Sequence, residues 1–377
     1  MNSSGKYISL FLLIIILFSG CQRNLLKEVQ FSPGRTAWCW GGDNSRRGKS
    51  PEEITPPLKL IWTYKASSAI GKSIVAADSF LFFGMKAGGV VVLNLNTGKP
   101  VKKIRTHKVE VTCSLDGRRL VLARRWGRPS LRSIDLFTGK TIWKRNLGPI
   151  SGEPLIIGNR LVFGNEGGEV FCLDSGTGKT LWKKNLGEHL RGSLSSSGDN
   201  LFAATEEGTI WSFSLEDGRI NWNQKIQSGI LSTPVIDSGK LFIGTTGGTF
   251  YALSLKDGSV VWEFKPRGKI YETAAAAGGF VYFGTTQGVL YCLYAKNGEK
   301  KWSFSTGSVV GTSPLISGSW LYFGTLDKIF YGILRENGEE KWNFKTKGRI
   351  RTSPLIRGRK LVIASEDCFV YGFAEKK

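Results

Sequence analysis

Histidine is almost absent from this chain, which has only His107 and His189 among its 377 residues. A metal centre built from several imidazole ligands is therefore excluded. Acidic residues do not gather into the loops rich in Asp, Asn and Glu that bind calcium, and only isolated carboxylates such as Glu110, Glu153 and Glu272 remain as candidate ligands. We accordingly predict no metal site, no cofactor and no catalytic residue.

A hydrophobic run long enough to cross a membrane is missing as well. The apolar stretch at 8–20 is shorter than the about 20 residues that a spanning helix needs. It follows Lys6 and ends in the small-residue sequence "LFSGC" (17–21), which is the layout of an export signal. Residues 1–20 are therefore predicted to be a signal peptide.

The end of this signal resembles a bacterial lipobox, in which Cys21 becomes the lipid-modified first residue of the mature protein. The alternative is an ordinary signal, cleaved or uncleaved, with an unmodified cysteine. In Gram-negative lipoproteins a residue such as Gln22 at the next position favours the outer membrane. We expect an outer-membrane lipoprotein that faces the periplasm, with residues 21–57 as a linker and lead-in.

Acidic charge is scarce relative to basic charge, with 30 Asp and Glu against 52 Lys and Arg and a net charge of +22. Such a balance attracts polyanions whatever the fold. Nucleic acid is not expected as a partner outside the cytoplasm. Lipopolysaccharide, acidic phospholipid or an acidic protein face are the polyanionic partners that we expect.

What the sequence does have is an internal repeat. "TGKTIWKRNLG" (138–148) returns as "TGKTLWKKNLG" (177–187), and the same pattern recurs at a period near 40 along the chain. The turn glycines of the series are Gly98, Gly139, Gly178, Gly218, Gly258, Gly298 and Gly338. The large residues of the series are Trp62, Trp143, Trp182, Trp222, Trp262, Trp302 and Trp342, with Lys102 in place of Trp in the first complete unit.

Each repeat predicts four short antiparallel strands, because apolar residues alternate and turn residues recur every 8 to 12 positions. Four-stranded units of this length are typical of a β-propeller. The chain has seven complete units, and the last segment (349–373) supplies three strands of an eighth. The segment "LKLIWTYK" (58–65) can complete that unit, so we predict an all-β, eight-bladed propeller over 58–377, closed by its N-terminal strand.

The six cysteines predict no particular disulfide. Cys172 and Cys292 occupy the same position three units apart, so they cannot pair with each other, and a buried free thiol is the expected state. Cys39, Cys113 and Cys368 can include one disulfide in an oxidising compartment, but the sequence does not give the connectivity.

The strand-turn-strand unit with "TGKxxW" resembles the repeat of the pyrroloquinoline-quinone-type propeller family over roughly 37–373. This resemblance implies that the Trp of each unit is structural and docks against the neighbouring blade. It also implies a looser junction where Lys102 replaces it. Within this family, the export signal, Cys21 and the number of units resemble the BamB family of outer-membrane assembly lipoproteins.

The BamB resemblance implies a scaffold without catalysis that docks on the outer-membrane barrel insertase. The main alternative is a lipoprotein propeller that binds another envelope partner or a polyanion. A third reading is a quinone- and calcium-dependent dehydrogenase, as in other members of the family. The chain lacks the adjacent cysteines of the alcohol dehydrogenases and is much shorter than those enzymes.

Propeller geometry predicts where a binding face lies. The second turn of each blade and the link into the next blade share one face of the ring. The second turn of the second blade is unusually basic, and some of the links place large or charged residues at the channel mouth. The candidate binding residues are Arg124, Arg125, Trp126 and Arg128 in that turn and Arg191, Tyr271 and Arg351 in the links. The alternative is that these side chains are only solvated.

Overall fold

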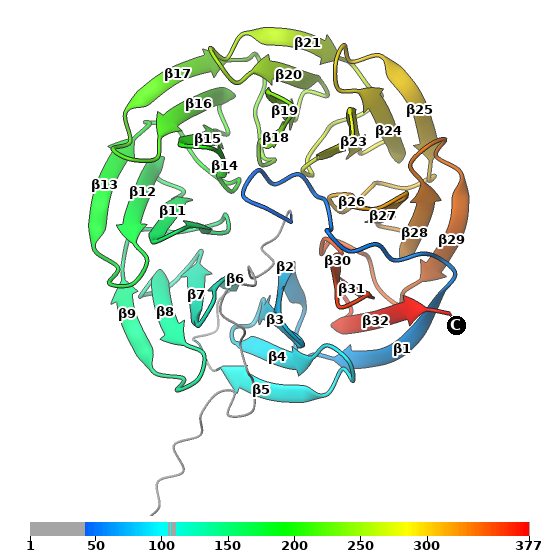
Figure 1. The fold of residues 1–377 in the computed structure, drawn as a ribbon, viewed down its shortest axis with the longest axis horizontal. Helices are drawn as coiled ribbons and strands as arrows, with labels where there is room; N and C mark the ends of the chain where they lie inside the picture. The colour runs from blue at the N-terminus through cyan, green and yellow to red at the C-terminus, as the bar shows by residue number, and fades with distance from the viewer. Residues whose placement is uncertain (1–41, 105, 107–110, 377) are drawn as a thin grey trace, which may run out of the picture.

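The structure, a computed structural model, describes residues 42–104, 106 and 111–376. These residues form eight four-stranded antiparallel sheets arranged around a central channel (Figure 1). The prediction of an all-β, eight-bladed propeller is therefore confirmed. No helix within the described residues is long and apolar enough to cross a membrane. The predicted signal peptide and Cys21 lie outside the described residues.

Blades 1 to 7 are continuous in the chain, and in each the innermost strand comes first. Blades 1 to 4 consist of β2 (Ile70–Ala77), β3 (Phe80–Met85), β4 (Val90–Asn94) and β5 (Pro100–Ile104); β6 (Val111–Asp116), β7 (Arg119–Arg124), β8 (Leu131–Asp135) and β9 (Thr141–Arg145); β10 (Leu155–Ile157), β11 (Arg160–Gly164), β12 (Glu169–Asp174) and β13 (Thr180–Asn185); and β14 (Ser195–Ser197), β15 (Asn200–Ala204), β16 (Thr209–Ser214) and β17 (Ile220–Lys225).

Blades 5 to 7 repeat the same order on the other side of the ring. They consist of β18 (Val235–Asp237), β19 (Lys240–Gly244), β20 (Phe250–Ser254) and β21 (Val260–Phe264); β22 (Ala275–Ala277), β23 (Phe280–Gly284), β24 (Val289–Tyr294) and β25 (Lys300–Ser305); and β26 (Leu315–Ser317), β27 (Trp320–Gly324), β28 (Ile329–Leu334) and β29 (Glu340–Lys345).

Blade 8 joins the two ends of the propeller. It contains β30 (Leu355–Arg357), β31 (Lys360–Ala364) and β32 (Phe369–Glu375), and β1 (Leu58–Lys65) is its outermost strand. β1 pairs antiparallel with β32 from Leu58 opposite Glu375 to Lys65 opposite Phe369. The indole N–H of Trp62 then donates to the carbonyl of Leu95 in blade 1 at 2.9 Å. The N-terminal strand thus closes the ring, as predicted.

The turn glycines and the Trp residues of the repeat form the junctions between blades. In blade 3, Gly178 has a φ of 71°, and a Cβ on it would lie 2.6 Å from the Trp143 ring of blade 2. Glycine is therefore required both by the turn and by the close approach of the indole. The Trp143 N–H donates to the carbonyl of Ser175 at 2.9 Å, and the equivalent bond is made by Trp62, Trp182, Trp222, Trp262 and Trp302.

Two positions depart from this junction. Trp342 faces no third turn in blade 8, because the outermost strand of that blade, β1, comes from the other end of the chain, and the Trp342 ring packs edge-on against Phe373. Lys102 stands where the other complete blades have Trp, and a hydrophobic cluster closes the junction between blades 1 and 2. That cluster includes Phe82, Val92, Ile104, Leu120 and Leu136.

A β-bulge lies next to each Trp of the series and determines which residue of the neighbouring strand pairs with it. In blade 3, Cys172 pairs with Trp182 and the register shifts at the next residue, which leaves Leu181 outside the ladder and 46% exposed. Cys292 lies opposite Trp302 in the same way. Both thiols are buried and free, and burial raises their pKa values to about 11 for Cys172 and about 12 for Cys292.

The cysteine pair that the sequence left open is not a disulfide between the described residues. Cys113 is buried in blade 2 and Cys368 lies in the second turn of blade 8, and both are free. Cys39 lies outside the described residues.

The lead-in before β1 runs inside the channel (blue in Figure 1). Its carbonyl groups accept hydrogen bonds from the innermost strands of four successive blades, and the four donors are spaced 40 residues apart. The bonds are Ser196 N–H to Asn44, Ile236 N–H to Ser45, Ala276 N–H to Arg47 and Ile316 N–H to Gly48, at 2.7 to 3.0 Å. This segment therefore covers the inner edges of blades 4 to 7.

Candidate functional site

One end of the channel opens into a cavity of about 220 Å³. The loops that frame it are the second turns and the inter-blade links, which hydrogen bond to each other in blade after blade. Glu206 N–H donates to the His189 carbonyl and Glu366 N–H to the Arg349 carbonyl, both at 2.8 Å. The two kinds of loop thus share one face, as the sequence predicted.

Four of the seven candidate binding residues line this single cavity. Arg125 comes from the second turn of blade 2, and Arg191, Tyr271 and Arg351 come from three different links. Leu231 also lines the cavity, at the equivalent link position of blade 5. Residues far apart in the chain therefore meet because they occupy the same position in different repeats.

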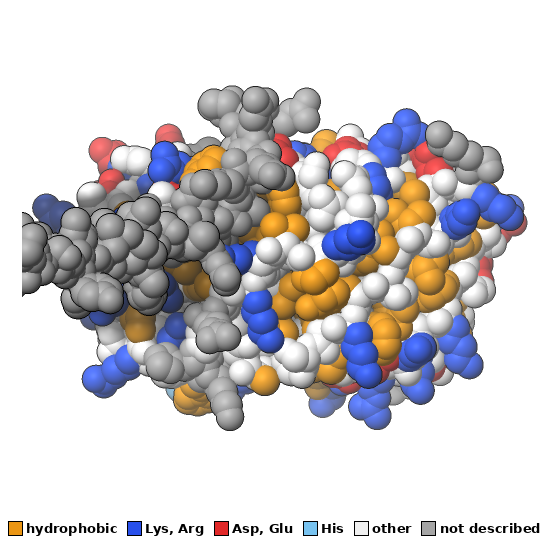
Figure 2. Space-filling view, turned by 90° about the horizontal axis from the view of Figure 1, so that it is seen from below, with side chains coloured by type: hydrophobic (Ala, Val, Ile, Leu, Met, Phe, Trp, Pro, Cys, Tyr) orange, Lys and Arg blue, Asp and Glu red, His pale blue; other side chains and the backbone are white. Residues whose placement is uncertain are grey.

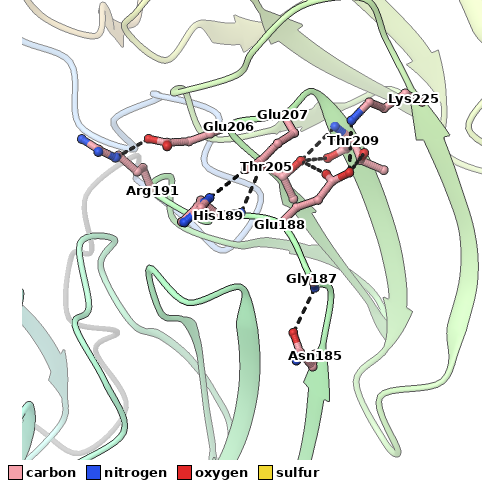
Figure 3. A network of polar contacts seen from close by, with 10 residues as sticks. All are labelled: Asn185, Gly187, Glu188, His189, Arg191, Thr205, Glu206, Glu207, Thr209 and Lys225. Carbon is pink, nitrogen blue, oxygen red and sulfur yellow. Dashed lines mark hydrogen bonds and ion pairs between the residues drawn. The ribbon is translucent and has the colours of Figure 1, made fainter.

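Each arginine at the mouth faces a glutamate of a second turn. Arg125 Nε lies 2.6 Å from Glu166 Oε1 and Arg351 Nε lies 3.2 Å from Glu366 Oε1. Arg191 pairs in the same way with Glu206, as Figure 3 shows. Exposed ion pairs of this kind contribute at most about 1 kcal/mol, so a carboxylate or phosphate of a partner can replace the glutamate at low cost.

The remaining three candidates do not line the cavity. Arg124 was expected on the surface but is only 3% exposed, because it ends β7 and both its backbone polar groups are bonded within the fold. Burial lowers its pKa, and the nearby charge of Arg132 adds to this effect. Trp126 is 56% exposed beside Arg125, and Arg128 is exposed, but neither lines the cavity.

The mouth combines cationic and exposed apolar groups. Trp126, Leu231 and Tyr271 are three of the large hydrophobic residues that remain exposed in the described chain. Trp, Tyr and Arg are the residue types that dominate binding energy at protein interfaces. The composition of the mouth is thus that of a docking surface.

The deeper wall of the cavity is a ring of small hydroxyl residues that the sequence analysis missed. Thr112, Ser193, Thr233, Thr273 and Ser353 hold equivalent positions and line it. Ser193 N–H donates to Thr233 Oγ1 at 3.1 Å, and Thr233 N–H donates to Thr273 Oγ1 at 3.0 Å. The signal was a Ser or Thr two residues after seven of the eight link positions, visible only once the repeats are aligned.

Glu153 takes one place in this hydroxyl ring. Its backbone N–H donates to Ser193 Oγ at 2.8 Å, and its carboxylate lies 3.7 Å from the guanidinium of Arg46. Arg46 is 0% exposed and also donates to the carbonyls of Leu194 and Glu153. Burial raises the pKa of Glu153 to about 7, although the charge of Arg46 lowers it.

A second polar network lies in blades 3 and 4, next to Arg191 of the mouth (Figure 3). Glu188 accepts hydrogen bonds from Thr205, Thr209 and Lys225 at 2.5 to 3.1 Å. Burial alone would raise the pKa of Glu188, but these three donors lower it below its ordinary value. His189 Nδ1 lies 2.8 Å from Glu207, and this contact raises the pKa of the imidazole. The network holds the link that carries Arg191.

The described residues do not fit a quinone with calcium. Glu153 is paired with Arg46, and the lead-in crosses the channel beside it. Glu272 lines the cavity, and Glu110 lies outside the described residues. No group of three or more His, Cys, Asp or Glu is close enough to hold a metal ion in the described part of the chain.

A family model described as outer membrane protein assembly factor BamB matches the chain at 127–269, 224–343 and 267–377. These overlapping matches extend over 127–377, which is well over half of the chain. A search of curated proteins finds no match.

Solved structures with the same fold are numerous and distant in sequence. BamB from Moraxella catarrhalis is 18% identical with a TM-score of 0.71, and the match covers 85% of this chain and 98% of that chain. A europium-containing methanol dehydrogenase is 13% identical with a TM-score of 0.78, covering 90% and 98%. The computationally designed Ika8 protein is 16% identical with a TM-score of 0.74, covering 82% and 97%. At these identities the structures show the fold alone.

Proposed function

The chain belongs to the family of the outer membrane protein assembly factor BamB, and from this premise we propose that it is a non-enzymatic docking scaffold for the assembly of outer-membrane β-barrel proteins. The observation that carries the proposal is the family match over 127–377. The channel mouth, with Arg125, Arg191, Tyr271 and Arg351, is the docking site in this proposal. Its partner is the barrel insertase.

The cellular setting of the proposal follows from the sequence. We propose that Cys21 carries the lipid and that the propeller faces the periplasm from the outer membrane. The mass of the N-terminal peptide of the mature protein tests this point. An unmodified peptide, or one that begins before residue 21, would contradict it.

The experiment that tests docking compares two triple variants of the full-length lipoprotein. The mouth variant carries Arg191→Ala, Tyr271→Ala and Arg351→Ala. The control variant carries Arg118→Ala in a first turn, Arg219→Ala in a third turn and Tyr294→Ala at the end of β24, which are exposed residues on the opposite face. Each protein is tagged and purified from gently solubilised envelopes, and the co-purifying insertase is quantified by mass spectrometry.

We expect the wild type and the control to recover the insertase equally, and the mouth variant to recover at least about tenfold less, because residues of these types cost 2 kcal/mol or more at interface hot spots. Equal recovery by both variants would move the docking site elsewhere. Failure of the wild type to recover the insertase would reject the assembly role.

The non-enzymatic part of the proposal has its own test. Purified protein incubated with pyrroloquinoline quinone and Ca²⁺ is expected to reduce no redox dye above the protein-free background, with alcohols or glucose as substrates. The physical reason is that the Arg46–Glu153 pair and the lead-in occupy the centre of the ring. Turnover that depends on both quinone and Ca²⁺ would refute the proposal.

A further inference from the structure

Net positive charge is concentrated on one part of the outer edge of the ring. In each of blades 1 to 7 this edge consists of the third turn and the outermost strand. In blades 1 to 3 these segments hold nine Lys and Arg and no Asp or Glu, over 95–104, 136–145 and 175–185. In blades 4 to 7 the equivalent segments hold ten Lys and Arg and eight Asp and Glu, over 215–225, 255–265, 295–305 and 335–345. The edge of blades 1 to 3, defined by the first three segments, is here called the basic edge.

The charges of the basic edge are exposed and mostly uncompensated. Of its nine cations, only Lys183 has an ion pair among the described residues, with Glu169 at 2.5 Å. On the opposite side, by contrast, Lys225 pairs with Glu188 and Lys341 with Glu339. Six side chains of the basic edge are exposed without such a partner in the described chain: Lys99, Lys103, Lys140, Lys144, Arg145 and Lys179. Their positive potential therefore extends into solvent.

Aliphatic side chains project between these cations. Val101, Ile142 and Leu181 occupy the bulge position of β5, β9 and β13, and each is more than 40% exposed. The bulge turns them away from the blade, so they are available for contact from outside. A basic surface with protruding aliphatic groups is the composition that binds the interfacial region of a bilayer.

The basic edge is continuous and convex. β5, β9 and β13 follow one another along the outside of the ring in Figure 1. Figure 2 views the ring from below in that orientation, and to the right of the grey atoms, on the rim towards β1, it shows Lys and Arg side chains interspersed with hydrophobic ones. A convex surface with one sign of charge suits an extended anionic surface better than a single small ligand.

We propose that the basic edge of blades 1 to 3 binds an anionic lipid surface, with its Lys and Arg on lipid phosphates and Val101, Ile142 and Leu181 at the headgroup boundary. This function is separate from docking at the channel mouth. The expected lipid on Cys21 would hold the edge near a bilayer, and one lipid anchor plus a basic patch is a recognised combination for stable membrane attachment. The bound edge would fix the orientation of the ring relative to the membrane.

The test uses residues 22–377, which lack the lipidation site but retain all eight blades, the lead-in and β1. Flotation with vesicles of phosphatidylcholine containing about 30% phosphatidylglycerol is compared with pure phosphatidylcholine vesicles. The edge variant changes five residues to Gln: Lys99, Lys140, Lys144, Arg145 and Lys179. The matched variant has the same net charge and also changes five exposed residues to Gln, on blades 5 to 7: Lys256, Lys265, Lys296, Lys300 and Lys345.

We expect the wild type to float with anionic vesicles only, and added salt to weaken this binding because exposed charges are screened beyond about 8 Å at physiological ionic strength. The edge variant should bind at least about tenfold more weakly, since each basic residue near an anionic surface contributes about fivefold. The matched variant should stay within about threefold of the wild type.

Three results would overturn the proposal. The first is equal weakening in both variants, which would mean that net charge alone drives binding. The second is no binding of the wild type to anionic vesicles at low salt. The third is wild-type binding to polyglutamate through the same five residues without binding to vesicles, which would assign the edge to an acidic protein. Unchanged melting temperatures of both variants establish that they remain folded.

Discussion

At the scale of single residues, one buried contact between charged groups, Arg46 and Glu153, lies in the channel. Arg46 belongs to the lead-in, whereas Glu153 belongs to the hydroxyl ring of the channel. The pair therefore links a segment outside the repeats to the repeats themselves. Because Arg46 lies outside the repeats, no periodic pattern in the sequence marks its position. Glu153 does stand out, because the equivalent positions of the other blades hold Ser or Thr.

The raised pKa of Glu153 predicts a pH-dependent stability. A carboxyl with a pKa of about 7 in the folded state and about 4.5 unfolded holds its proton more tightly when folded. The contribution of Glu153 to the free energy of unfolding is therefore largest below about pH 4.5, and it decreases as the pH rises to about 7. Relative to the Glu153→Gln variant, the wild type should lose roughly 3 kcal/mol between pH 4.5 and pH 8.

Urea unfolding of both proteins at the two pH values measures this difference. Glu216→Gln, at an exposed third turn, is the control and should follow the wild type at both values. If the free energies of unfolding of the wild type and the Glu153→Gln variant differ by the same amount at pH 4.5 and at pH 8, Glu153 does not titrate in this range.

At the scale of strands and blades, the repeat determined most of what could be predicted. The positions of Gly178 and its equivalents follow from turn chemistry. The four-strand unit follows from the alternation of apolar residues and the spacing of turn residues. The fold and its closure could therefore be predicted from the sequence. The face that carries Arg125, Arg191, Tyr271 and Arg351 followed from the same geometry. The burial of Arg124 did not follow, because one residue decides whether a side chain belongs to a strand or to its turn.

The blade junction predicts a graded loss of stability at Trp222. Its indole packs against Gly258 of the next blade, and its N–H donates to the Leu255 carbonyl at 3.0 Å. Trp222→Ala should destabilise the fold by about 3–5 kcal/mol, because it leaves a cavity at the junction. Trp222→Phe should cost less, with about 1 kcal/mol of the loss due to the missing hydrogen bond.

Chemical denaturation of both variants gives these values, with Trp126→Ala as the control. Trp126 is exposed at the channel mouth, so its removal should change stability by no more than about 0.5 kcal/mol. Equal effects of Trp222→Ala and Trp126→Ala would mean that the Trp series does not stabilise the junctions.

At the scale of the whole molecule, the channel mouth and the outer edge of blades 1 to 3 differ in their charge. The mouth arginines are balanced by glutamates, whereas the edge of blades 1 to 3 carries charge of one sign. The lead-in and β1 run in sequence, and together they cover the inner edges of blades 4 to 7 and complete blade 8. The N-terminal segment thus connects channel and rim within one stretch of chain.

Ring closure predicts different outcomes for two truncations. A chain that begins at residue 57 keeps β1 but loses the lead-in, whereas one that begins at residue 67 loses both. The first should remain a monomer with reduced stability, because β1 still pairs with β32 and Trp62 still reaches Leu95. The second should aggregate, because β32 becomes an open strand edge and the last blade has three strands. Size-exclusion chromatography with light scattering distinguishes these states, and a monomeric, cooperatively unfolding chain from residue 67 would show that β1 is not needed to close the ring.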